Sequence, residues 1–428
     1  MNFISPLTNT WQFYADYWWL FTPVFLGAAA ISALLHYRTQ QYLFGLKWVL
    51  LEIKPPPDVM QSPKIAENLF AALHSTYLPV KWKKRFFKGE VPKWFSLEIV
   101  SNGGDIHFYI RAQEDVKTLA EHAVFAQYPD AEIREVDDYV RQLPPRLPTP
   151  EYDLFGADLI FTKADAFPIK TYIGFEEAGG KDEFVRTDPL APLAEVLAAL
   201  EPGEHIWLQF LIRPTGANWV KAAKPVVDEL GGKKVKPPAN LLHTIMDLTE
   251  SGVGALTGAT PAEPKQEEKK NDFNLQKLTP GQKYALEQVE NKIAKIGFKS
   301  NIRFIYSART ELFHRSHISS VIGMFKQLYS NNLNTFKPDG KTMTFSKGWL
   351  HHIFPSENGF FKPQLEARRK RKLFLAYVRR SFRKKVIILN TEELATLWHL
   401  PGIIVKAPGF PRVEAKKGQP PAGLPTIQ

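Results

Sequence analysis

The feature that most constrains this chain is an uncharged run near its start, residues 17–35, with the sequence YWWLFTPVFLGAAAISALL. No acidic or basic side chain occurs between Asp16 and His36. Uncharged apolar runs of about 18 or more residues are typical of membrane-spanning helices, because that length covers roughly 30 Å of hydrocarbon. The sequence therefore predicts a transmembrane helix over residues 17–36, preceded by an extracytoplasmic tail of residues 1–16.

Aromatic residues flank the run in the way that interfacial rings flank a spanning helix. Those expected at the membrane interface are Trp11, Tyr17, Trp18 and Trp19. A cleaved signal peptide is the alternative, because residues 28–30 contain an A-x-A pattern. A signal peptide has a basic region before its apolar core, however, and no Lys or Arg precedes Arg38. A retained anchor is the interpretation that the charges favour.

The charges that flank the run predict its orientation. Asp16 precedes it, whereas Arg38, Lys47 and Lys54 follow it. Basic residues concentrate on the cytoplasmic side of a spanning helix. The sequence thus predicts a single-pass protein with its N-terminus outside, a membrane-proximal connector over residues 37–62 and a cytoplasmic body.

The charge and the cysteine count narrow the classes of partner and site. The chain has 428 residues, a formal net charge of +11 and no cysteine. An excess of positive charge favours anionic partners such as nucleic acid or lipid headgroups. The absence of cysteine excludes disulfides and thiolate metal ligands. We expect no cofactor and no metal site.

Connectors rich in proline, glycine and charge divide the chain. Residues 251–276 contain almost no bulky apolar side chains and cannot bury enough surface to offset their ordering entropy, which predicts a disordered linker. Residues 413–428 are rich in proline and glycine and predict an extended tail. Two folded regions are therefore expected, over residues 63–250 and 277–412.

Strands followed by helices recur in both regions. Alternating apolar residues predict strands, and apolar residues at spacings of three and four predict helices. The pairs expected from these patterns are strand 106–111 with helix 116–124, strand 206–212 with helix 219–230, and strand 302–306 with helix 318–329. The predicted fold class is α+β: a transmembrane helix followed by two ferredoxin-like α+β modules joined by the disordered linker.

The C-terminal part has its own local signals. Residues 364–382 have a helical pattern, and residues 386–389 predict a short buried strand. Asn390 and Glu393 have the spacing of a capping box, in which the two side chains bond each other's backbone N–H groups at a helix start. A helix is expected from there to His399, before the Pro401-Gly402 pair.

The strongest candidate binding segment is a basic run in the predicted helix and just after it. Its members are Arg368, Arg369, Lys370, Arg371, Lys372, Arg379, Arg380, Arg383, Lys384 and Lys385. Apolar residues interleave with them. Such a helix could bind nucleic-acid phosphates, anionic lipid or an acidic protein, or it could be a solvated helix face. We expect an anionic surface as its partner.

A second basic patch lies closer to the predicted anchor. Its cations are Lys81, Lys83, Lys84 and Arg85, and Trp and Phe side chains alternate with them. This composition is typical of a contact with a membrane surface. A loop whose aromatic residues face the core would have the same composition.

Signals for catalysis are weak. The sequence contains no GxxxxGK[ST], GxSxG or HExxH motif. His314 and His317 form a lone HxxH pair, and His351-His352 suits loop packing. A hydrolase or transferase that uses Asp137, Asp138, Glu176 and Glu177 would need at least three of them in one cleft. We therefore expect a chain that is not an enzyme.

Three stretches, residues 95–139, 298–309 and 386–402, carry a resemblance to a known group of proteins. They resemble the membrane-proximal region of bacterial proteins related to conjugative coupling ATPases, the HerA/FtsK-like DNA pumps of type IV secretion. In those proteins a segment like LNTEELATLWHLPG precedes the motor domain, and the resemblance spans most of residues 50–425. The resemblance implies a location at the bacterial inner membrane.

The motor domain of the resembled proteins has no counterpart in this sequence, which contains no Walker A loop. It therefore implies a non-catalytic docking or anchor subunit of a DNA-translocation or secretion-like assembly. The expected partners are the bilayer, a HerA/FtsK-like ATPase encoded separately, DNA and further copies of the chain. The alternative is a membrane-associated scaffold that binds anionic lipid and protein but no nucleic acid.

Overall fold

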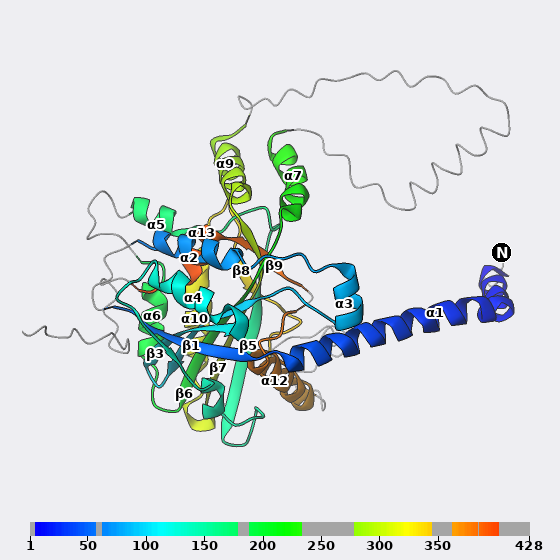
Figure 1. Ribbon diagram of the computed structural model, residues 1–428, viewed down its shortest axis with the longest axis horizontal. Helices are drawn as coiled ribbons and strands as arrows, with labels where there is room; N and C mark the ends of the chain where they lie inside the picture. The colour runs from blue at the N-terminus through cyan, green and yellow to red at the C-terminus, as the bar shows by residue number, and fades with distance from the viewer. Residues whose placement is uncertain are drawn as a thin grey trace, which may run out of the picture.

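The computed structural model describes residues 5–56, 62–178, 188–232, 278–344, 362–383 and 385–401. Figure 1 shows an α+β body from which one long helix extends. The strands are β1 (Trp48–Lys54), β2 (Phe95–Asn102), β3 (Asp105–Gln113), β4 (Glu132–Glu135), β5 (Tyr152–Phe161), β6 (Glu204–Pro214), β7 (Gly297–Arg309), β8 (Phe336–Pro338) and β9 (Ile387–Asn390). The helices are α1 (Ser5–Gly45), α2 (Lys64–His74), α3 (Trp82–Lys88), α4 (Lys117–Phe125), α5 (Tyr172–Ala178), α6 (Ala191–Ala198), α7 (Asn218–Leu230), α9 (Pro280–Ala294), α10 (Arg315–Gln327), α12 (Lys362–Val378) and α13 (Thr391–Leu397).

All nine strands belong to one sheet. Its order is β4-β1-β3-β2-β6-β7-β5-β8, and β9 pairs with the first residues of β7 beyond the end of β5. Every pairing is antiparallel. The long central strands β6 and β7 pair along eleven residues, from the pair Glu204 and Ala308 to the pair Pro214 and Phe298.

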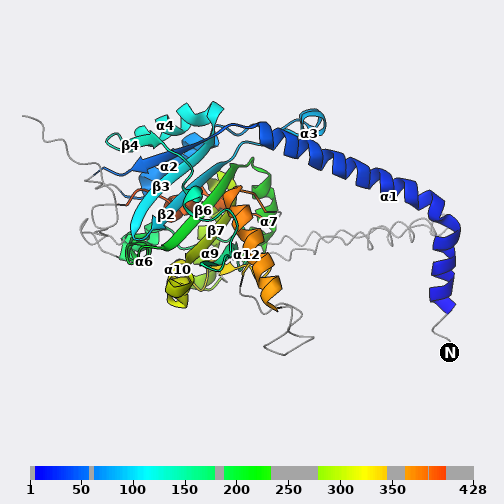
Figure 2. The ribbon, with the colours of Figure 1, turned by 90° about the horizontal axis from the view of Figure 1, so that it is seen from below.

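The two faces of the sheet are covered unequally. Helices α2, α4, α6, α10 and α13 contribute to the larger core on one face. The smaller core on the opposite face is closed by α12 and by the short 3-10 helix η2 (Tyr139–Gln142). Figure 2 shows α12, in orange, lying across that face. This second face holds the candidate site.

The single sheet corrects the predicted fold class of two modules. Strand β7 follows residues 251–276 in the chain, yet it pairs with β5 and β6, which precede them. The two predicted modules therefore share one continuous sheet and one core, and neither is a separate ferredoxin-like unit. The local patterns predicted strands but not their partners, since each pairing joins residues far apart in sequence. The linker 251–276 and the tail 413–428 lie outside the described residues.

The predicted transmembrane helix is also corrected. Residues 17–36 are helical as part of α1. In the part of the chain that the structure describes, no helix is both long enough and apolar enough to cross a membrane. Absence of charge was the basis of the prediction, but the run also contains tyrosine, tryptophan, threonine, proline and glycine, which dilute its apolar character. This finding corrects the predicted single-pass topology, and with it the inner-membrane localisation as far as that depended on this helix.

Most of the elements expected from local pattern are present. The helices predicted near residues 116–124, 219–230 and 318–329 correspond to α4, α7 and α10, and the three strands paired with them correspond to β3, β6 and β7. Strand β1 lies within the segment that was predicted to be a membrane-proximal connector, residues 37–62. Strands β2 and β5 were not predicted, and both are almost entirely buried.

Helix α1 extends away from the body in both views (Figures 1 and 2) and contacts α3. Gly89 makes this approach possible. It has a φ of 68° at the end of α3, and a β-carbon there would overlap the backbone of Arg38 in α1. Only glycine adopts such a conformation without strain and leaves that space open.

Candidate functional site

A row of polar side chains crosses the second face of the sheet. Glu98 of β2 lies opposite Gln209 of β6, Gln209 lies opposite Arg303 of β7, and Arg303 lies opposite Asp158 of β5. These four side chains are all buried. Buried charges are costly unless they are paired and hydrogen-bonded. Their neighbours therefore decide what this polar row does.

Arg380, in the turn after α12, closes one end of the row. Its Nε lies 3.0 Å from Glu98 Oε1 and its Nη2 lies 3.1 Å from Glu98 Oε2. The same Nη2 lies 2.8 Å from Asp138 Oδ1. Arg380 is 1% exposed and has a φ of 46°, which is unusual for a residue other than glycine. One guanidinium thus donates hydrogen bonds to two carboxylates.

Further hydrogen bonds surround Glu98. Tyr139 donates its hydroxyl proton to Glu98 Oε2 at 2.7 Å, and Gln209 Nε2 donates to Glu98 Oε1 at 3.1 Å. Burial alone would raise the pKa of Glu98, but the charge of Arg380 and the hydrogen bonds from Arg380, Ser96 and Tyr139 outweigh it, and the pKa is lowered. Burial raises the pKa of Tyr139, so its hydroxyl stays protonated as a donor.

Arg303 anchors the other half of the row. Its Nε donates to Asp158 Oδ1 at 2.7 Å, and its Nη1 donates to Gln209 Oε1 at 3.2 Å and to the Ala376 carbonyl at 2.8 Å. Arg383 Nε lies 2.9 Å from Asp158 Oδ2, an ion pair without hydrogen-bond geometry. Gln209 therefore joins the two charged clusters, and both hold the end of α12.

The packing of α12 agrees with this role. Leu373, Phe374 and Tyr377 lie in the smaller core, and Gly156 of β5 leaves space into which the Leu373 side chain fits. Lys370 lies on the same side of α12 and pairs with Asp153. The charges of the row are satisfied by one another and by α12. Chemically, the row positions a helix and presents no free reacting group.

A pH dependence follows from this arrangement. Burial opposes ionisation of Glu98 and Asp138, but the bonds and charge of Arg380 lower the pKa of both. Carboxyls with lowered pKa values stabilise the fold above their unfolded pKa of about 4, and this contribution is lost as pH falls through the folded value. We expect urea unfolding midpoints to fall below about pH 4. This loss of stability at low pH should be shallower in Asp138→Asn than in Asp137→Asn, because the Asp137 side chain is exposed.

A second buried charge cluster holds α13. Asn390 and Glu393 form the predicted capping box, which is confirmed. Lys292 Nζ of α9 lies 3.0 Å from Glu393 Oε2, with both side chains 0% exposed. Lys295 Nζ lies 2.7 Å from Glu392 Oε2 and 2.9 Å from Glu67 Oε2 of α2. The C-terminal strand and helix are thus built into the main core.

The basic run divides into an inner and an outer set. Lys370, Arg380 and Arg383 have internal carboxylate partners. Arg369 is half-buried. The exposed members are Arg368, Arg371, Lys372, Arg379 and Lys385, whereas the side chain of Lys384 lies outside the described residues. The prediction of an anionic partner therefore stays open for the exposed set, which we call the outer basic face of α12.

The second basic patch forms helix α3, where a loop had been one alternative. None of its residues is buried, and Lys81, Lys83, Lys84 and Arg85 are all exposed. Tyr17, Trp18 and Trp19 are exposed on α1, and the side chain of Trp11 lies outside the described residues. Sequence reasoning missed Arg111 of β3 and Arg213 of β6, which lie singly within strands and lack the clustering by which a basic run is found.

The three acidic residues of the hydrolase alternative whose side chains are described have separate partners. Asp138 pairs with Arg380, Asp137 pairs with Arg141 at the surface, and Glu176 of α5 accepts a bond from Ser62. The side chain of Glu177 and residues 351–352 lie outside the described residues. Within the described ranges, no three His, Asp or Glu side chains gather as a metal-binding group. His317 pairs with Glu204 instead, at 3.4 Å.

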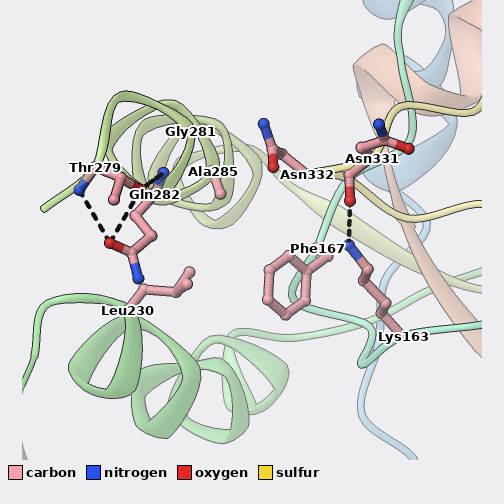
Figure 3. Close-up of a pocket in the computed structure, with 9 residues that line it drawn as sticks. All are labelled: Lys163, Phe167, Leu230, Thr279, Gly281, Gln282, Ala285, Asn331 and Asn332. Carbon is pink, nitrogen blue, oxygen red and sulfur yellow. Dashed lines mark hydrogen bonds between the residues drawn. The ribbon is translucent and has the colours of Figure 1, made fainter.

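A pocket of about 240 Å³ lies at the start of α9 (Figure 3). Its lining residues are Lys163, Phe167, Leu230, Thr279, Gly281, Gln282, Ala285, Asn331 and Asn332. Thr279 and Gln282 bond each other as the N-terminal cap of α9, and Lys163 donates to the Asn331 carbonyl at 2.9 Å. These bonds engage Thr279, Gln282 and Lys163, and the lining contains neither a carboxylate nor a histidine. The pocket therefore has no acid–base pair for catalysis.

Comparison with known proteins supplies a family. A search among curated proteins finds no match to this chain. A family model described as a domain of unknown function, DUF8128, matches residues 39–408. The match begins within the C-terminal part of α1 and includes the whole sheet, both buried charge clusters and α12. The chain therefore belongs to the DUF8128 family of domains of unknown function.

Proposed function

We propose that the chain is a non-catalytic docking module of a DNA-translocation or secretion-like assembly that works with an ATPase encoded separately. The observation that carries this proposal is the division of the basic run. Its inner cations fix α12 to the sheet, and its outer basic face leaves Arg368, Arg371, Lys372 and Arg379 in solvent. A rigidly mounted row of cations is suited to bind phosphates or an acidic protein surface.

The charges on the buried side of α12 support the same proposal. Lys370 and Arg380 each form an ion pair with a carboxylate on a strand, so the sheet determines which side of α12 faces outward. A helix that served only to keep the protein soluble would not need such fixation. The resemblance to coupling proteins supplies the class of assembly, and the family itself has no described function.

Neutralising the outer basic face tests the proposal. We expect Arg368→Gln/Arg371→Gln/Lys372→Gln to weaken binding to a duplex of about 30 base pairs by about tenfold or more at moderate salt. The slope of log K against log salt should fall by about 2–3, because each lost phosphate contact removes close to one released counterion. Fluorescence anisotropy of a labelled duplex across a salt series measures both quantities.

The matched control carries the same charge change elsewhere. Lys221 and Lys224 of α7 and Lys326 of α10 are exposed, and Lys221→Gln/Lys224→Gln/Lys326→Gln should leave affinity and slope close to wild type. Equal losses in both triple variants would show a non-specific charge effect and reject the proposed interface. Absence of salt-sensitive DNA binding together with absence of co-purification with a HerA/FtsK-like ATPase would reject the proposed function. Flotation with anionic vesicles in place of DNA binding would favour the lipid-binding scaffold.

A further inference from the structure

Two arginines on the polar face of the sheet stack on aromatic rings. The Arg111 guanidinium of β3 lies 4.3 Å from the centre of the Trp48 ring. Trp48 packs against Trp94 with ring centres 4.7 Å apart, and Trp94 meets Phe382 edge-on at 6.1 Å. The Arg213 guanidinium of β6 lies 4.8 Å from the Phe382 ring centre. We call these five side chains the arginine–aromatic stack.

The arginines of the stack differ from the other arginines of the same face. Arg303 and Arg380 each bond a buried carboxylate. Within the described part of the chain, no carboxylate lies within ion-pair distance of Arg111 or Arg213. Burial lowers the pKa of Arg111 to about 10, and burial followed by the charge of Arg85 lowers the pKa of Arg213. Both are partly desolvated cations that form no ion pair with a carboxylate of the described residues, although the charges of Glu98 and Asp138 act on Arg111 from farther away.

An unsatisfied donor lies in the same stack. The Trp94 side chain is 9% exposed, and its indole Nε1 has no hydrogen-bond partner among the described residues. A guanidinium held flat on a ring keeps its in-plane N–H groups directed outward, in a fork that matches a phosphate. The stack therefore concentrates donors without acceptors. That is the chemistry of a site for an external anion.

Helix α3 adds aromatic surface beside the stack. Helix α3 ends at Lys88, six residues before Trp94 of the stack, and the charge of Arg85 acts on Arg213. Trp82 is 68% exposed and Phe87 is 64% exposed, on a helix with no acidic residue. Exposed rings among cations are suited to stack on nucleobases, which all have a flat aromatic face. Phe382, in the segment that follows α12, belongs to the stack, so the basic run after α12 also reaches this site.

We propose that the arginine–aromatic stack and α3 together bind single-stranded nucleic acid, with phosphates on Arg111 and Arg213 and bases on Trp82 and Phe87. The inference rests on the proposed function in that both require a nucleic-acid partner. Arg111 and Arg213 belong to strands that are separated only by β2. Arg111 is level with Leu211, so two strand spacings and a two-residue offset place the Cα atoms of the two arginines about 12 Å apart, which suits an extended chain of phosphates better than one lipid headgroup.

The test uses the full chain and a labelled oligothymidylate of about 20 nucleotides. We expect Arg213→Gln and Trp82→Ala/Phe87→Ala each to raise the dissociation constant about tenfold or more. Two controls match them. Arg309→Gln changes an exposed arginine at the opposite end of the sheet, and Phe125→Ala removes an exposed ring from α4 on the other face. Both controls should bind like wild type.

Every outcome of this test discriminates. Trp82 and Phe87 are exposed, so their replacement cannot act by unfolding the core, and unchanged binding in that variant overturns the inference. If Trp82→Ala/Phe87→Ala no longer sediments with anionic phosphatidylglycerol vesicles but still binds oligothymidylate, α3 is a lipid contact, and this result also overturns the inference. If only the triple variant of α12 weakens the oligonucleotide, the proposed function stands and this inference fails. If Arg213→Gln binds oligothymidylate weakly while the triple variant of α12 binds duplex normally, the inference stands and the proposed role of α12 fails.

Discussion

Replacing Arg380 by alanine is expected to lower the free energy of unfolding by about 3–5 kcal/mol, the usual cost of removing one partner from a buried ion pair. Glu98 is 0% exposed and would lose both of its bonds to the guanidinium. Asp138 would lose its bonds as well. The substitution therefore leaves the buried Glu98 carboxylate without its ion-pair partner and removes the ion pair of Asp138.

Urea denaturation at neutral pH measures this loss, and the neighbouring residue supplies the control. Arg379 is exposed, and Arg379→Ala should change the free energy of unfolding by no more than about 0.5 kcal/mol. Arg380→Gly removes the same guanidinium but suits the φ of 46°, so it should be less destabilising than Arg380→Ala by about 1 kcal/mol. A loss under 1 kcal/mol in Arg380→Ala would show that the pair does not hold the turn after α12.

The contrast between Arg379 and Arg380 marks a limit of sequence reasoning. Both were predicted to contact an anionic surface, because they belong to one basic run. Arg380 instead bonds Glu98 and Asp138, which lie 282 and 242 positions away in the chain. No local pattern encodes a partner at such a distance. The sequence predicted a basic helix with an apolar stripe correctly, but it could not tell which cations face inward.

The same reasoning explains which elements were predicted. Helices with one apolar face, such as α4 and α10, and the capping box of Asn390 and Glu393 depend on residues within a few positions of one another. Strand β5 is buried on both faces, so its apolar residues do not alternate with polar ones. Strand β2 does alternate from Phe95 to Ile99, and that signal was missed. Their polar members Glu98 and Asp158 resemble surface residues until their neighbours on the sheet are known.

The pairing of strands was the part that local signals could not supply. Strand β9 pairs with the first residues of β7, and β7 pairs with β6, which precedes it by more than eighty positions. The arginine–aromatic stack depends on that arrangement, because Arg213 meets Phe382 only when β6 lies beside the turn after α12. Single arginines within strands give no clustered signal, so this candidate site was invisible before the fold.

The second large effect is expected at Trp398, directly after α13. Its ring is 0% exposed and packs edge-on against Phe70 of α2 and Phe108 of β3, with ring centres 6.4 Å and 6.0 Å away. Removing such a side chain deletes buried apolar surface and leaves a cavity, because the surrounding core relaxes only in part. Trp398→Ala should lower the free energy of unfolding by about 3–5 kcal/mol.

The position of Trp398 gives this prediction a wider consequence. Every residue of α13 is buried, and Glu393 pairs with Lys292 of α9. A cavity beside α13 should therefore loosen the contacts of α13 with α2 and α9. Faster amide hydrogen exchange in all three helices would report this loosening.

Two comparisons separate packing from polar effects at this position. The indole Nε1 of Trp398 is buried and has no hydrogen-bond partner among the described residues, so Trp398→Phe removes this donor together with part of the ring. It should cost clearly less than Trp398→Ala. Tyr329 is 50% exposed, and Tyr329→Ala should stay within about 1 kcal/mol of wild type. If Trp398→Ala matched Tyr329→Ala in urea unfolding, α13 would be a peripheral element, and the C-terminal helix could not be part of the main core.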